Sequence, residues 1–137
     1  MALSRLVKFL KLSGRKKGIF LTALGALWII RIGLWVLPHS CIRKLASGMK
    51  AKPVIGKLTI EELVWSVETS SKYVLSATCL TQALAAKMLL ARNGYSSTLR
   101  IGVDTCNGFA AHAWIEQNGV VILGGSVRQY KPLYVLE

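Results

Sequence analysis

Acidic residues are scarce in this chain of 137 residues, and none precedes Glu61. The first 60 residues contain 12 of the 18 lysines and arginines, whereas residues 61–137 balance six basic side chains against six acidic ones. The whole net charge of +12 therefore belongs to the front segment, and the rest of the chain is electrically neutral.

Cysteine and histidine are also rare, with three and two residues, respectively. Three widely spaced cysteines exclude the disulfide framework of a small secreted protein and favour a reducing, cytoplasmic compartment. There is no CxxC pair, so a structural zinc site would have to use Cys79, Cys106 and His112 alone. We therefore expect neither a metal nor a cofactor.

An uninterrupted apolar run of full membrane-spanning length is missing as well. Residues 19–30 form an apolar run, which Arg31 interrupts before Pro38 ends the apolar stretch. A spanning helix needs about 20 apolar residues, and a central arginine costs about 2.5 kcal/mol on insertion scales. No small-residue cleavage site follows at the distance that a signal peptide requires. We therefore expect no secretion, and a transmembrane span is not favoured.

Residues 3–12 have the pattern of a basic amphipathic helix, because four aliphatic side chains recur at helical spacing and the basic ones lie largely off that face. Such a helix can bind an anionic membrane surface, at the inner face of a cytoplasmic membrane. Alternatively, both front helices pack against the back of the protein. Nucleic acid is disfavoured as a partner, because the basic residues alternate with aliphatic rather than aromatic side chains.

The back of the chain predicts an α+β domain. Thr59 and Glu62 have the spacing of a capping box, which predicts a helix over residues 60–71. A second helix begins near Thr78 or Cys79, and Asn93 with Gly94 ends it. Three short strands follow as an antiparallel meander, at residues 98–103, 109–116 and 120–123, with Asn118–Gly119 as the last turn. We divide the chain into a front segment, 1–57, and a core domain, 58–137.

Cys79 and His112 are the candidate catalytic pair. A helix N-terminus stabilises a thiolate through its free amide groups and dipole, and Cys79 stands at such a position. A cysteine at the start of a helix, followed by a histidine on a strand, is the order in which papain-like enzymes of the transglutaminase type present nucleophile and base. By itself, a lone cysteine in an apolar helix is more often a buried small hydrophobic residue.

The motifs ATCLTQAL around Cys79 and AHAWIE around His112 resemble the leader peptidases of lasso-peptide biosynthesis. In split systems these form the second half of the B protein, within the transglutaminase-like superfamily. The likeness covers residues 58–137, and the basic, aliphatic front end is similar too. It implies a papain-like or transglutaminase-like fold, with Cys79 as nucleophile and His112 as general base and acid.

The resemblance also implies the reaction and its partners. The cysteine attacks a peptide bond of a ribosomal precursor and releases the leader, so that a separate ATP-dependent cyclase can close the macrolactam. Residues 1–57 are too short and too apolar for a leader-recognition module, so we expect a separate recognition protein, and an exporter. The alternatives are acyl transfer by a transglutaminase-like enzyme and a non-catalytic, membrane-associated scaffold.

The third catalytic residue departs from the family's pattern. Many members carry an aspartate about twelve residues after the histidine, where this chain has Gly124. A two-residue turn at Asn118–Gly119 would pair Glu116 with Val121, Trp114 with Leu123 and His112 with Gly125. We expect a backbone carbonyl or Ser126, near this strand end, to orient His112 through Nδ1.

Distance from His112 and position on a strand face distinguish the remaining candidate residues. Glu116 shares a strand face with His112 but lies roughly 13 Å away along the strand, and we expect Asp104 on the opposite face of the neighbouring strand. Trp114 would wall the substrate groove or pack in the core, and Gln82 would help to bind an oxyanion or face solvent. We expect Gly124→Asp to be neutral or to raise activity modestly.

Overall fold

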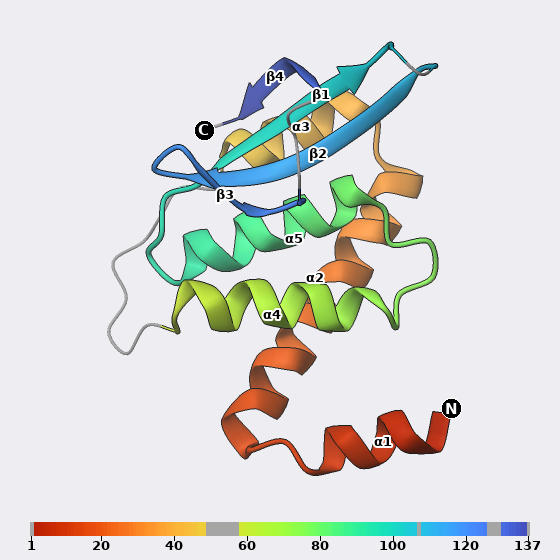
Figure 1. The fold of residues 1–137 in the computed structure, drawn as a ribbon, viewed down its shortest axis with the longest axis vertical. Helices are drawn as coiled ribbons and strands as arrows, with labels where there is room; N and C mark the ends of the chain where they lie inside the picture. Colours follow the sequence, from red (N-terminus) through yellow and green to blue (C-terminus); the bar gives the residue numbers. More distant parts are fainter. Residues whose placement is uncertain (1, 49–57, 107, 126–129, 137) are drawn as a thin grey trace.

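The computed structural model describes residues 2–48, 58–106, 108–125 and 130–136, as five helices and one four-stranded sheet (Figure 1). The helices are α1 (Ala2–Leu10), α2 (Gly14–Val36), α3 (His39–Ser47), α4 (Ile60–Ser71) and α5 (Cys79–Arg92). The strands are β1 (Thr98–Asp104), β2 (Ala110–Gln117), β3 (Val120–Leu123) and β4 (Lys131–Leu136). The boundary expected between residues 57 and 58 borders residues 49–57, which lie outside the described part.

Helix α5 is the centre of the core, because it contacts β1 and β2 of the sheet as well as α2 and α4 (Figure 1). Four alanines make its surface small enough for neighbours to approach on several sides: Ala83, Ala85, Ala86 and Ala91. Its buried Lys87 does not interrupt the core, because Nζ donates a hydrogen bond to the Ser97 carbonyl oxygen at 2.7 Å. The helix that carries the candidate nucleophile is therefore held firmly in place.

Helix α2 packs one of its sides into this core. The buried residues of that side recur at helical spacing: Ile19, Phe20, Ala23, Ala26 and Leu27. The hydroxyl of Ser70 in α4 donates a hydrogen bond to the Phe20 carbonyl oxygen at 3.1 Å. The front segment therefore supplies part of the core, which the sequence had left open.

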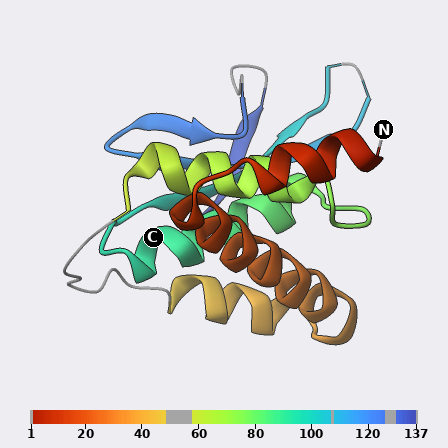
Figure 2. The same ribbon diagram turned by 90° about the horizontal axis from the view of Figure 1, so that it is seen from below.

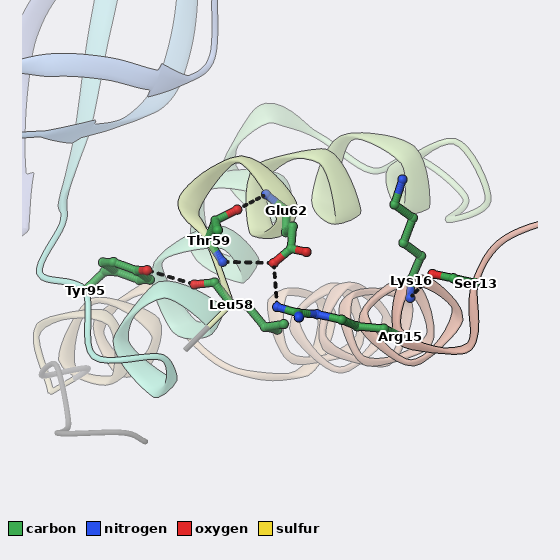
Figure 3. Close-up of polar contacts among 7 residues, drawn as sticks. All are labelled: Ser13, Arg15, Lys16, Leu58, Thr59, Glu62 and Tyr95. Carbon is green, nitrogen blue, oxygen red and sulfur yellow. Dashed lines mark hydrogen bonds and ion pairs between the residues drawn. The ribbon is translucent and has the colours of Figure 1, made fainter. Parts of the chain in front are cut away.

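Polar contacts at the start of α4 join this region to α2 and to Tyr95, which follows the end of α5 (Figure 3). The capping box is present as predicted, because Glu62 N donates to Thr59 Oγ1 and Thr59 N donates to Glu62 Oε2. Glu62 also pairs with Arg15 of α2 at 3.2 Å, and the Tyr95 hydroxyl donates to the Leu58 carbonyl oxygen at 2.8 Å.

The sheet has the order β3-β2-β1-β4, with neighbours antiparallel. The three predicted strands are present, and the α+β architecture of helices followed by an antiparallel sheet is confirmed. The sequence did not predict β4, which pairs with β1 at the far edge. Its Pro132 is the reason, because a proline within a short apolar run argues against a strand unless that strand lies at an edge.

Candidate active site

Cys79 is the first residue of α5, and its position is fixed by the N-cap Thr78. Thr78 Oγ1 accepts a hydrogen bond from Thr81 N at 3.3 Å, and the two hydroxyl groups lie 3.0 Å apart. The first amide groups of a helix have no carbonyl partner within it, so the Cys79 backbone N–H is available to an external acceptor. The thiol itself is free and half-buried.

His112 lies on β2, and its Nε2 is 2.7 Å from the Gly124 carbonyl oxygen. A carbonyl oxygen only accepts hydrogen bonds, so Nε2 carries the proton of the neutral ring and Nδ1 is the acceptor. A backbone carbonyl at this strand end thus orients the imidazole, as the sequence suggested. The expectation that it binds Nδ1 was wrong, since the structure uses Nε2.

A β-bulge in the hairpin brings Gly124 to this position. Glu116 pairs with Val121 as predicted, but the register then shifts, so that Leu123 lies opposite Ile115 rather than Trp114. The predicted pairs beyond Glu116 were therefore wrong. The extra residue places Leu123 in the core beside Ile115 and turns the chain at Gly124.

Gly124 could not be replaced by a larger residue without displacing its surroundings. Its φ of +117° is a conformation that side-chain-bearing residues rarely adopt, and an added Cβ would lie 2.5 Å from Trp114 Cβ. The expectation that Gly124→Asp would be harmless is therefore wrong. The contribution of Gly124 to the site is its carbonyl oxygen, which accepts from His112 Nε2.

Aromatic rings support the imidazole. The Trp114 ring stacks on His112 with centroids 6.2 Å apart, and the Tyr130 ring lies 5.0 Å from His112. Trp114 is only 2% exposed and is not among the described residues that line the cleft beside Cys79. Of its two expected roles, the structure therefore supports packing rather than a wall of the substrate groove.

One cleft of about 300 Å³ brings the candidate residues together. It is lined by Glu68, Cys79, Gln82, His112, Leu123, Gly124 and Gly125. Cys79 and His112, which lie on different elements, thus open onto the same space. The Gln82 amide nitrogen donates to the Ala77 carbonyl oxygen at 3.4 Å, which holds this side chain beside the helix start.

Glu68 is the cleft residue that the sequence analysis missed. It projects from α4 and supplies the one carboxylate among the described lining residues. The signal available was the spacing of Glu61 and Glu68, which places two carboxylates on the same side of α4. Both also line a neighbouring pocket along α4.

The other carboxylates considered are engaged elsewhere. Glu116 accepts hydrogen bonds from Arg100 Nε at 2.7 Å and from Trp114 Nε1 at 2.8 Å. The expectation that Asp104 lies on the opposite sheet face from His112 was wrong. Gly102 pairs with His112, and Asp104 follows Gly102 by two residues on the same strand, so Asp104 and His112 share one face. Its Oδ1 accepts from Cys106 N at 2.9 Å. Ser126 lies outside the described residues.

No group of three His, Cys, Asp or Glu residues that could hold a metal occurs within the described part of the chain.

Comparison with known proteins identifies the family of this chain. No curated protein and no solved structure matches the chain. A family model described as the transglutaminase-like superfamily matches residues 24–135, a range that includes most of α2, the whole of β1, β2 and β3, and all but the last residue of β4. Its domain is commonly a catalytic cysteine enzyme, and the chain belongs to the transglutaminase-like superfamily.

Proposed function

We propose that this protein is a cysteine peptidase that cleaves the leader from a lasso-peptide precursor. The observation that carries the proposal is that Cys79, at a helix start, and His112, with Nδ1 as its acceptor, line the same cleft. The motifs around both residues, ATCLTQAL and AHAWIE, resemble those of lasso-peptide leader peptidases. The order cysteine on a helix and histidine on a strand suits nucleophilic catalysis.

In the first half of the reaction, His112 Nδ1 accepts the proton of the Cys79 thiol as the sulfur attacks the carbonyl carbon of the scissile bond. A tetrahedral intermediate forms and then collapses to a thioester. The C–N bond breaks, and His112 returns the proton to the leaving amine. This amine is the new N-terminus of the core peptide, which the macrolactam cyclase requires.

In the second half, water attacks the thioester. His112 Nδ1 accepts a proton from that water, a C–O bond forms, and the C–S bond breaks. The leader leaves with a free carboxyl group, and His112 returns its proton to the sulfur, which restores the thiol of Cys79. During both halves, the hydrogen bond from Nε2 to the Gly124 carbonyl oxygen holds the ring in one orientation.

Two donors are available for the oxyanion of each tetrahedral intermediate. One is the Cys79 backbone N–H, which is fixed by the helix start. The other is the Gln82 side chain, whose amide has a second hydrogen beyond the one given to Ala77. Both lie on the cysteine side of the cleft.

The proposal requires further proteins. A separate recognition protein binds the leader, and an ATP-dependent cyclase uses the released amine. An exporter then removes the product. In this scheme the peptidase needs no cofactor and acts in the cytoplasm.

Acyl transfer is the second candidate, because the same thioester would yield an amide if an amine replaced water. A non-catalytic scaffold is the third, and it is favoured only if the missing aspartate inactivates the site. The Gly124 carbonyl bonded to His112 weighs against that view, since the imidazole is already oriented.

Mass spectrometry of a precursor peptide incubated with this protein and the recognition protein tests the proposal. We expect a leader fragment and a core fragment whose masses sum to the mass of the precursor plus one water. Cys79→Ala should give no product. The controls Cys41→Ala and Cys106→Ala should cleave normally. Full cleavage by Cys79→Ala would overturn the peptidase assignment, and amine-linked products would replace it with acyl transfer.

A further inference from the structure

Helix α2 is apolar on all sides, yet only one side is covered. Opposite the buried side lie large apolar side chains that are 41–75% exposed: Leu21, Trp28, Ile29, Ile32, Trp35 and Val36. At 100° per residue, these positions and the buried ones fall on opposite sides of the helix. A soluble helix normally places polar residues on its outer side. The exposed apolar side of α2 is therefore expected to contact something other than water.

Helix α1 carries a second set of exposed apolar side chains. Leu3, Val7 and Leu10 are exposed at helical spacing, with Lys8 and Lys11 exposed beside them. Figure 1 places α1 at the end of the molecule remote from the sheet, and Figure 2 shows it diverging at an angle from the start of α2. We refer to the exposed apolar residues of α1 and α2 named here as the α1–α2 apolar face.

Positive charge lies beside this face, although Arg15 also pairs with Glu62. The segment contains no acidic residue, and exposed lysines and arginines lie around the junction of the two helices: Lys8, Lys11, Arg15 and Lys16. The Arg31 guanidinium lies over the Trp35 ring at 5.2 Å, so that its apolar stem borders the face while its charge stays at the edge. Exposed tryptophans flanked by cationic side chains are typical of the boundary between lipid headgroups and acyl chains.

We propose that the α1–α2 apolar face binds an anionic membrane surface and lies in the plane of the interface. Apolar side chains would insert below the headgroups, while the lysines and arginines contact the lipid phosphates. The inference is independent of the peptidase assignment, because it uses none of the cleft residues.

The packing of α2 favours the membrane surface over a transmembrane span. By length and apolarity, Gly14–Val36 could cross a bilayer. However, its inner side is packed against α4 and α5, and Ser70 joins α4 to the Phe20 carbonyl. Spanning would carry the charged residues of α4 into the hydrocarbon layer, which is costly. A second copy of the chain is disfavoured as the partner, because two cationic rims would meet.

Vesicle flotation of the full chain tests this proposal. The protein should float with vesicles of phosphatidylcholine mixed with phosphatidylglycerol, much less with phosphatidylcholine alone, and less at high salt. The double variant Ile32→Ser/Trp35→Ser should bind anionic vesicles about 100-fold more weakly, because two large apolar side chains no longer insert. Its circular dichroism should be unchanged, because both side chains are exposed.

The matched control is Phe109→Ser/Leu133→Ser, which removes two apolar side chains outside the face that are at least as exposed as a pair, at 80% and 59% against 70% and 54% for Trp35 and Ile32. Its vesicle binding should equal that of the original protein. Absence of flotation with anionic vesicles, or flotation that the Ile32/Trp35 variant retains, would overturn the proposal. So would a dimer in sedimentation analysis without lipid that this variant abolishes, since a second copy would then cover the face.

Discussion

The front and back of this molecule differ in charge and in what they expose. Helices α1 and α2 belong to a segment without acidic residues, and they present large apolar side chains to the outside. From α4 onward, positive and negative charges balance, and the candidate catalytic residues gather in one cleft. Our two proposals divide the molecule in the same way, with binding to a membrane surface at the front and chemistry at the back.

Helix α2 is the element that joins the two tasks. Its inner side completes the core around α5, the helix that carries Cys79, while its outer side forms most of the α1–α2 apolar face. A change on the outer side should therefore affect association with lipid alone. A change at the contact between α2 and α4 should affect the stability of the whole domain.

Gly124→Asp should have the largest effect on the back region. The added Cβ would lie 2.5 Å from Trp114 Cβ at a φ of +117°, so we expect a loss of about 3 kcal/mol in unfolding free energy. Urea denaturation measures it. Gly125→Ala is the matched control, because nothing lies within 4 Å of its Cβ, and it should lose about 1 kcal/mol. Unchanged stability of Gly124→Asp would contradict the hairpin geometry.

Ser70→Ala tests the joint between the two regions. It removes the buried hydrogen bond from α4 to the Phe20 carbonyl oxygen, and we expect a loss of about 1 kcal/mol in unfolding free energy. Ser71→Ala is the control, because its hydroxyl bonds Glu68 O within the same helix, and thermal unfolding should hardly change. If both variants unfold alike, the hydrogen bond from Ser70 to the Phe20 carbonyl oxygen contributes nothing to stability.

Glu116→Gln should have the smallest effect on cleavage, less than about tenfold. The carboxylate binds Arg100 and Trp114 rather than His112, so its loss leaves the imidazole bonded to Gly124. Cleavage rates on a precursor peptide measure the effect, with circular dichroism as the check on folding. A loss of several orders of magnitude in a folded variant would make Glu116 the third catalytic residue.

Local signals predicted the elements that position the site. The capping box at Thr59 and Glu62, the start of α5 at Cys79 and the Asn118–Gly119 turn all depend on residues close in sequence, and all three are present. For the same reason, the placement of Cys79 at a helix start and of His112 on a strand could be foreseen.

Features that depend on distant contacts were missed. The bulge at Ile115–Glu116 adds one residue to the hairpin. The alternation of apolar and polar residues along the sequence does not reveal this extra residue. Glu68 reaches the cleft only because α4 packs beside α5, and β4 becomes a strand only by pairing with the edge of β1. The exposed side of α2 could not be told from its buried side, because both are apolar.

Alkylation of the three cysteines by iodoacetamide, mapped by mass spectrometry of the full chain, tests the central claim most directly. Exposure alone would make Cys106 react first, because its residue is exposed whereas Cys79 is half-buried. If His112 activates Cys79, then Cys79 should react fastest, and His112→Ala should slow it more than about tenfold while Cys106 is unchanged. Fastest labelling of Cys106, with no effect of His112→Ala on Cys79, would contradict the account.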